Sequence, residues 1–220
     1  MSVKAITEED IKTLETLAAK YPERRSALLP MLHYVQSIQG MVSPAGIQVC
    51  AKVLDLTPAE VAAVATFYTM YKRFPMGKHH IGVCVNTLCA LLGGDDLWKE
   101  LTDTLGIGHD ETTADGLFTL ERIECQAACT VAPVMTVNWE FMDSMNPKSL
   151  KDLIDKLKLG APVQSTRGVQ ITSISDSQRV LAGINDGKYQ DSPLADDSML
   201  AGLRVAKERN MSAPVGKGAK

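Results

Sequence analysis

The sequence predicts an α/β protein with three successive parts: a helical bundle over residues 1–74, a layer of helices and strands over 75–160, and an extended tail over 161–220. Three observations predict this division. Helix caps and apolar stripes at helical spacing recur in the first part. Short strand-like runs alternate with helices in the second part. Periodic apolar positions become rare in the third.

The composition is that of an ordinary globular protein. Of the 220 residues, 45% are hydrophobic and 22% are charged, and the net charge is −3. A basic run is absent, so we expect no nucleic-acid partner. Apolar runs are too short for a transmembrane helix, and the N-terminus lacks a signal peptide's apolar region. We therefore expect a cytoplasmic protein without direct membrane insertion.

Helix start signals mark the first part. Thr7 with Asp10, and Thr57 with Glu60, have the spacing of a capping box. Ser43 precedes a proline, which is typical of a helix N-cap followed by the first helical residue. Apolar side chains then recur at three- and four-residue spacing. The pattern predicts a small bundle of helices.

The second part predicts strands separated by helices. Alternating or continuous apolar runs indicate the strands, and leucines at four-residue spacing indicate the helices. A proline after Asn146 marks the start of the last helix, which Gly160 ends. The expected strands are 79–85, 117–123 and 134–137, and the expected helices are 95–105 and 147–159.

The third part has the composition of a segment without its own core. It has one aromatic residue, Tyr189, among scattered Gly, Ser and Asp. Only Ser198 to about Asn210 suggests a helix, and residues 214–220 look like a loose end. Such a segment is disordered or is shaped by a partner.

Four of the five cysteines form two close pairs, Cys84 with Cys89 and Cys125 with Cys129. Thiolates suit zinc, copper(I) and iron–sulfur clusters. A [2Fe–2S] cluster needs four thiolates, and its known loops include a C-x4-C step. Zinc at the same sulfurs remains an alternative, although structural zinc sites usually use tighter spacings. A dithiol redox role is a third, although C-x-x-C is absent.

The remaining residues of interest have ordinary alternatives. Asn86, Thr87 and Gln126 are able to hydrogen-bond a cluster sulfur or merely to cap loop turns. Cys50 lies on an apolar helix stripe and is expected to be a small buried hydrophobe. Gly93-Gly94 is read as a turn and helix cap, since no dinucleotide- or phosphate-binding pattern is present. The chain is therefore expected to carry electrons without binding NADH itself.

Longer stretches around the cysteines resemble a known family. The stretches are ATFYTMYKRFPMGKHHIGVCVNTLC (65–89), IECQAACTVAPVMTVN (123–138) and the helix after Asn146-Pro147. They are similar to the thioredoxin-like [2Fe–2S] subunits of respiratory complex I, the E-type subunits of bacterial NADH:quinone oxidoreductase. The likeness covers roughly residues 7–160. Two positions depart from the pattern: Leu88 stands where a proline is common, and Ala127 where a glycine is common.

The resemblance implies a thioredoxin-like [2Fe–2S] ferredoxin domain with one cluster. Cys84 and Cys89 bind one iron, and Cys125 and Cys129 bind the other. It implies an FMN- and NADH-binding partner subunit, the large iron–sulfur subunit of complex I as a second partner, and a place on the inner face of the plasma membrane. The chain then acts as an enzyme only as a subunit, without a complete active site of its own.

The same module also resembles subunits of NAD-dependent formate dehydrogenases and NAD(P)-linked hydrogenases. The long tail favours complex I over these smaller complexes. We expect residues 161–220 to lie as an extended strap on partner subunits. In such assemblies the cluster lies off the main path to quinone, so it is expected to store an electron rather than relay it.

Overall fold

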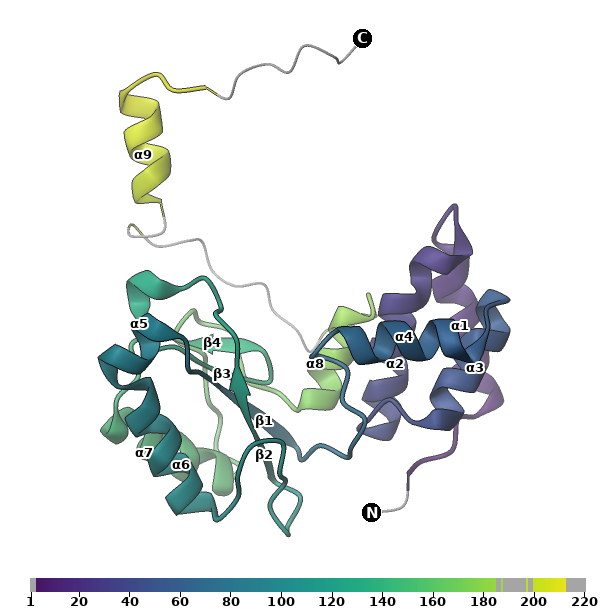
Figure 1. The fold of residues 1–220 in the computed structure, drawn as a ribbon, viewed down its shortest axis with the longest axis horizontal. Coiled ribbons are helices and arrows are strands. Elements are labelled where there is room, and N and C mark those ends of the chain that lie inside the picture. Colours follow the sequence, from purple (N-terminus) through teal and green to yellow (C-terminus); the bar gives the residue numbers. More distant parts are fainter. Residues whose placement is uncertain (1–2, 185–186, 188–196, 198–199, 213–220) are drawn as a thin grey trace.

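The structure, a computed structural model, describes residues 3–184, 187, 197 and 200–212. Within them a helical bundle, a sheet with helices and a C-terminal helix follow one another along the chain (Figure 1). The elements are α1 (Glu8–Ala19), α2 (Leu28–Gln39), α3 (Pro44–Leu54), α4 (Pro58–Phe67), β1 (His79–Cys84), α5 (Thr87–Cys89), α6 (Asp95–Leu105), β2 (Phe118–Ile123), β3 (Met135–Val137), β4 (Glu140–Met142), α7 (Pro147–Lys158), α8 (Ile174–Leu181) and α9 (Ala201–Glu208).

Helices α1 to α4 form the bundle, and the predicted N-caps are confirmed. The hydroxyls of Thr7 and Thr57 accept from backbone N–H groups of the first turn, while Asp10 and Glu60 accept from the N–H of the cap residue. Ser43 caps α3 in the same way. Each cap contributes about 1 kcal/mol of stability. The apolar faces meet in a buried core that includes Leu14, Met31, Leu32, Val35 and Val61.

The sheet has the strand order β2-β1-β3-β4 in the described residues. Strands β1 and β2 run parallel, with Cys84 opposite Ile123, whereas β3 is antiparallel to β1 and β4 to β3. Helices α6 and α7 lie on the side of the sheet away from the bundle (Figure 1). There they bury Leu101 and Ile154 with Phe118 of β2. The predicted mixed layer of helices and strands is confirmed, with β4 as an additional short strand.

Residues 161–184 pack against the rest of the chain, although their composition suggested an extended tail. Val169, Ile171 and Ile174 are buried, and α8 packs against α2 of the bundle. His33 Nδ1 on α2 lies 2.5 Å from Gln178 Oε1 on α8. Val169 and Ile171 precede α8 and belong to no helix, whereas α8 starts at the capping box of Ser173 with Asp176, a sequence signal that the polar composition of the segment obscured.

Helix α9 confirms the helix expected near the C-terminus over residues 201–208. None of its side chains is buried, and Leu203 and Val205 are exposed. The expected start at Ser198 and the loose end at 214–220 lie outside the described residues. No helix of the described residues is long and apolar enough to cross a bilayer.

The side chain of Asn138 hydrogen-bonds the turn between β3 and β4 to the start of β1. Asn138 and Trp139 both have positive φ, 54° and 72°, as a two-residue hairpin turn requires. The Asn138 side chain accepts from the N–H of His80 at 2.7 Å and donates to Thr172 O at 2.7 Å. It also lies 3.1 Å from Nδ1 of His79. One amide thereby joins two strands to the segment that follows α7.

The packing of residues 161–184 predicts different outcomes for two truncations. A chain ending at Gly160 loses several buried apolar side chains, each worth about 1.5–3 kcal/mol. We expect its Tm to fall by more than about 10 °C. A chain ending at Ile184 keeps these contacts and should unfold near the full-length Tm. Equal Tm values for the two truncated chains, measured by circular dichroism, would contradict the packing.

His79 predicts that stability falls in acid. Burial lowers the pKa of His79 to about 4, so the folded state keeps the imidazole neutral while the unfolded state takes up a proton below about pH 6.5. The unfolded state therefore binds more protons between pH 6.5 and 4, and stability falls as the pH is lowered through this window. We expect a loss of roughly 2–3 kcal/mol from this group. Urea unfolding at several pH values measures it.

The variant His79→Gln provides the matched control. Glutamine does not titrate, so its stability should change less between pH 6.5 and 4, whatever its absolute stability at pH 7. Buried His80, whose pKa is also lowered by burial, acts in the same direction and remains in both proteins. Identical pH slopes in the two proteins would show that His79 is not the group responsible.

Candidate metal centre

The two cysteine loops leave the sheet at the same end. Strands β1 and β2 are parallel, and Cys84 at the end of one lies opposite Ile123 at the end of the other. The N–H of Val85 donates to Ile123 O at 3.4 Å, which keeps the strand ends together. Because carboxyl ends of parallel strands share one edge, Cys125 begins its loop beside Cys84.

The four predicted cysteines lie on these two loops as two unlike pairs. Cys84 and Cys89 are only 1% and 3% exposed, whereas Cys125 and Cys129 are exposed. The sulfurs of Cys125 and Cys129 are 3.9 Å apart. The thiol of Cys129 interacts electrostatically with Cys84 and with Cys89, across the two loops. Both loops therefore start at the same end of the sheet, and each carries two thiols.

Apolar side chains surround the buried pair. Cys84 and Cys89 form a cluster with Ile123 and Val134, and residues of the second loop and of β4 pack against it. These additional side chains are Ala128, Val131, Ala132 and Phe141. A shell of this kind limits water access and lowers the local dielectric, which tunes any metal held there.

Two thiols are held in their protonated form. Burial raises the pKa of Cys89 to about 11, and the neighbouring Cys84 raises it further, against a hydrogen bond from the backbone of Val134. The pKa of Cys129 is raised chiefly by its contact with Cys125. A reactive dithiol requires a lowered pKa. The raised pKa values therefore argue against the dithiol redox alternative, and any metal bound by these thiols must displace their protons.

Ala127 places a backbone donor on a sulfur. Its N–H donates to Sγ of Cys125 at 3.4 Å. Its φ of 55° lies in the left-handed region, which glycine adopts more easily than alanine. The loop thus keeps a glycine-like conformation at the position where the resembling family commonly has glycine.

The polar side chains of the loops bind backbone and carboxylate groups rather than sulfur. Asn86 Oδ1 accepts from the N–H of Cys125, and Asn86 Nδ2 donates to Glu124. Gln126 Nε2 donates to the carbonyl of Glu124. For Asn86 and Gln126 the structure supports the loop-capping alternative, and no described hydrogen bond joins Thr87 to a sulfur.

Gly94 is a site residue whose role the sequence did not reveal. Residues 90–94 form a π-helical turn between Cys89 and α6. A Cβ on Gly94 would lie 2.8 Å from Cys89 O and 2.9 Å from Cys84 O. Glycine is therefore required for the turn to approach the backbone of both buried cysteines. The only sequence signal was the Gly93-Gly94 pair, which resembles an ordinary helix cap.

Cys50 lies in the bundle, away from this site. It is fully buried on α3, and burial raises its pKa to about 12. The prediction of a small buried hydrophobe is confirmed. Within the described residues, no group of three or more His, Cys, Asp or Glu side chains is arranged to hold a single metal ion.

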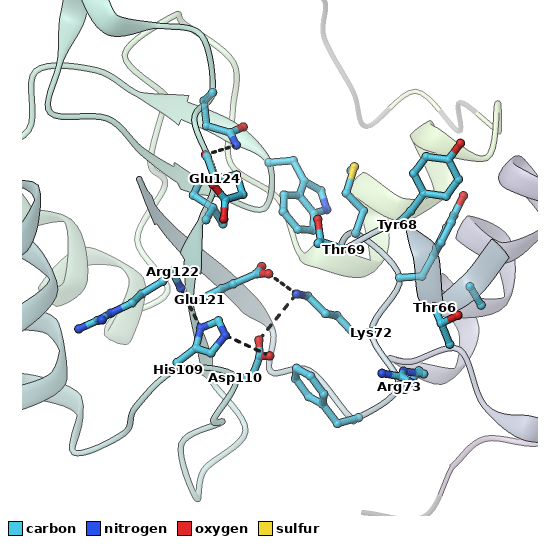
Figure 2. Close-up of a pocket in the computed structure, with 17 residues that line it drawn as sticks. Thr66, Tyr68, Thr69, Lys72, Arg73, His109, Asp110, Glu121, Arg122 and Glu124 are labelled. Carbon is cyan, nitrogen blue, oxygen red and sulfur yellow. Dashed lines mark hydrogen bonds and ion pairs between the residues drawn. The ribbon is translucent and has the colours of Figure 1, made fainter. Parts of the chain in front are cut away.

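A cleft lies between the bundle and the sheet. Figure 2 shows its two walls. One wall is the connector, residues 68–78 between α4 and β1, with Tyr68, Lys72 and Arg73; the other is on the sheet side, with Asp110 and Glu121. Its volume is about 990 Å³. One end reaches the second cysteine loop at Gln126, but none of the four cysteines lines it.

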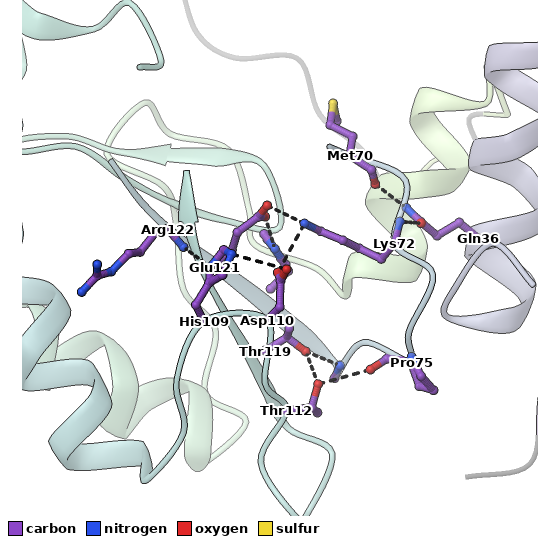
Figure 3. A network of polar contacts seen from close by, with 12 residues as sticks. Gln36, Met70, Lys72, Pro75, His109, Asp110, Thr112, Thr119, Glu121 and Arg122 are labelled. Carbon is purple, nitrogen blue, oxygen red and sulfur yellow. Dashed lines mark hydrogen bonds and ion pairs between the residues drawn. The ribbon is translucent and has the colours of Figure 1, made fainter. Parts of the chain in front are cut away.

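A buried ionic network crosses this cleft (Figure 3). Lys72 Nζ lies 2.5 Å from one oxygen of Glu121, and His80 Nε2 lies 2.8 Å from the other. Asp110 is 3.7 Å from the same ammonium group. The N–H of Lys72 donates to the side chain of Gln36 on α2. The network thereby ties the bundle, the connector and two strands together.

The charges of this network compensate one another. Burial raises the pKa of Glu121, but His80 and Lys72 outweigh it, and the net result is a lowered pKa. Burial lowers the pKa of His80. Removing one partner of such a buried set typically costs about 3–5 kcal/mol. We therefore interpret the cleft as the junction at which ionic contacts hold the bundle against the sheet, and not as a catalytic pocket.

Comparison with known proteins identifies the fold family. The thioredoxin-like [2Fe-2S] ferredoxin family matches residues 14–158. The chain belongs to this family. The predicted thioredoxin-like ferredoxin fold is thereby confirmed, and membership supports an iron–sulfur cluster as the cofactor.

Relatives and a solved structure extend this thioredoxin-like assignment. The E-type subunit of the NADH-quinone oxidoreductase of Mycobacterium tuberculosis is 48% identical over 204 residues, which cover 92% of this chain and 81% of that one. Subunit 2 of the Thermus thermophilus enzyme is 42% identical over 150 residues, 67% of this chain and 83% of that one. An NAD+-reducing [NiFe]-hydrogenase structure has a TM-score of 0.56 at 23% identity, covering 61% of this chain and 23% of that one. That last likeness concerns the fold alone.

The close approach at Gly94 predicts that Gly94→Ala displaces the turn behind the buried cysteines. A methyl group under 3 Å from two carbonyl oxygens forces a backbone shift, and we expect a loss of roughly 1–3 kcal/mol in stability. Gly202→Ala is the matched control, because nothing lies within 4 Å of its added Cβ. Thermal unfolding measures both. Equal Tm values for the two variants would contradict the crowding at Gly94.

Proposed function

We propose that this chain is the E-type electron-transfer subunit of an NADH:quinone oxidoreductase, with one [2Fe–2S] cluster on Cys84, Cys89, Cys125 and Cys129. The observation that carries the proposal is that two loops with two cysteines each leave the same end of a parallel strand pair. Relatives named as subunits of this enzyme match over most of their length. When bound, such a cluster accepts and returns one electron.

The donor set fits this cofactor. Four thiols are present, two on each loop, as a binuclear cluster requires. Cys84 with Cys89 would hold one iron and Cys125 with Cys129 the other. The backbone N–H of Ala127 already donates to Sγ of Cys125, where it favours the charged thiolate. A zinc-stabilised module would use the same sulfurs, and metal analysis distinguishes the two.

The exposed face of the site supports a partner that exchanges the electron. Cys125 and Cys129 open to solvent on one side. Next to the first loop, Leu88, Leu91 and Leu92 are 43%, 78% and 54% exposed. Exposed leucines gathered beside a redox site are typical of a protein interface. We infer that the FMN- and NADH-binding subunit docks here.

The remaining assignments follow from membership in such a complex. NADH oxidation and quinone reduction belong to other subunits, because this chain offers no nucleotide-binding pattern and no complete active site. The large iron–sulfur subunit is the second expected partner. We infer a cytoplasmic position, peripheral to the inner face of the plasma membrane. An equivalent subunit of an NAD-dependent formate dehydrogenase or NAD(P)-linked hydrogenase is the alternative, and co-purification of the partner separates them.

Metal and sulfide analysis tests the proposal first. Anaerobically purified protein should contain two iron atoms and two acid-labile sulfides per chain, as the [2Fe–2S] formula requires. The Cys125→Ala variant should lose the EPR signal of the reduced cluster, while Cys50→Ala, outside the site, keeps it. Zinc without sulfide in the unmodified protein, or an unchanged signal in Cys125→Ala, would overturn the assignment.

A further inference from the structure

One side chain of the first cysteine loop is bonded to the second. Asn86 Oδ1 accepts from the backbone N–H of Cys125 at 3.1 Å, and Asn86 Nδ2 donates to Glu124 Oε2 at 3.2 Å. An N–H group only donates and a carboxylate only accepts, so these partners fix which end of the amide is which. The two bonds join residues that are 38 and 39 positions apart in the sequence.

These bonds continue the strand pairing into the loops. The last backbone bond between β1 and β2 is from the N–H of Val85 to Ile123 O. Beyond it, in the described part of the chain, the hydrogen bonds from residues 86–94 to residues 124–132 come from the Asn86 side chain. This amide therefore supplies the polar link between the two loops, beside the apolar packing of Ala128 and Val131 on the buried cysteines.

The exposed pair needs such a restraint more than the buried pair does. Cys84 and Cys89 are held by apolar packing with Ile123 and Val134. Cys125 is exposed and lacks that packing, so hydrogen bonds to its backbone hold its position. A cluster that bridges both pairs needs their separation fixed before it binds, because the site gains affinity from a preset geometry.

We propose that Asn86 is a positioning residue that clamps the two halves of the cluster site together. The inference rests on the proposed function, since it assigns a role toward a cluster on the four cysteines. The clamp needs an acceptor for the N–H of Cys125 and a donor for the Glu124 carboxylate, and a primary amide supplies both. A carboxylate at position 86 keeps the acceptor but places two negative charges side by side.

This chemistry allows a charge-matched exchange as the test. Asn86→Asp alone sets a carboxylate against Glu124 and opens the loops. Adding Glu124→Gln supplies an amide donor to the new carboxylate at position 86, so the double variant restores the bridge with reversed polarity and the original net charge. Asn86→Ala removes both bonds. Gln126→Ala is the control, because its amide bonds only the carbonyl of Glu124 within its own loop.

The full chain, purified anaerobically, is compared for cluster loss to an iron chelator and for the EPR spectrum. Losing such an outer contact typically weakens a metal site about 10- to 100-fold, so we expect roughly tenfold faster loss in Asn86→Ala and Asn86→Asp. The double variant should return to within about threefold of the unmodified rate and recover its spectrum. Gln126→Ala should match the unmodified protein.

The outcomes separate the two proposals. An unmodified chain without iron and sulfide overturns the proposed function itself. An unmodified chain that holds its cluster, with Asn86→Ala losing iron at the same rate, overturns only the clamp. A double variant as defective as Asn86→Asp also overturns it, because a general loss of loop structure and not the bridge would then be responsible. Hydrogen exchange at the Cys125 amide supplies a readout that does not depend on the cluster, and it should be faster in Asn86→Ala.

Discussion

The parallel pairing of β1 with β2 positions both cysteine loops of the candidate metal centre and the ionic network that joins the sheet to the bundle. The register that puts Cys84 opposite Ile123 also puts Gly82 opposite Glu121. Leu120 then faces α6 and α7, and Glu121 faces the connector that carries Lys72. Because side chains alternate along a strand, a slip of one residue would exchange these two faces. The ionic network and the convergence of the cysteine loops thus depend on the same set of backbone hydrogen bonds.

The candidate metal centre is asymmetric because its two halves are held by different forces. The inner half is fixed by apolar packing and by the close approach of Gly94 to two carbonyl groups. The outer half is fixed by hydrogen bonds to exposed backbone, including those at Cys125 and Ala127. Water competes with the second kind of contact and not with the first. The outer half is therefore the part whose geometry a docking partner is able to influence.

Local signals predicted much of the fold. Capping residues such as Thr7 and Ser43 mark helix starts by chemistry that acts within one turn. The spacing of the four cysteines, together with the surrounding segments, indicated the family and the thiol set. These features depend on neighbours in the sequence, and so a single sequence shows them. Features that depend on distant surfaces were not visible in it. Glu121 looks like a solvent-facing strand residue until Lys72 and His80 are seen beside it.

The roles of some turns, and of residues near the C-terminal end, were not predicted, because they too depend on distant parts of the chain. The turn at Asn138-Trp139 lacks the glycine that usually marks such hairpins, because the Asn138 side chain is satisfied by β1 and Thr172. The burial of Val169 and Ile171 depends on surfaces made by earlier segments, whereas α8 did carry a local signal, the capping box of Ser173 with Asp176. Gly94 has a clear role only once the carbonyl groups of two cysteines surround it.

The return of α8 to the bundle has a consequence for how the chain is made. Ser175 donates to the carbonyl of Ser37, and these residues are 138 positions apart in the sequence. During synthesis α2 leaves the ribosome long before α8, so the surface that α8 covers stays open while the ferredoxin domain is being completed. Closing a loop of this length costs about 4 kcal/mol in chain entropy, a cost reduced once the intervening sheet has folded. The bundle is thus completed only when one of the later segments has been translated, and the face of α2 that α8 covers stays exposed to solvent until then.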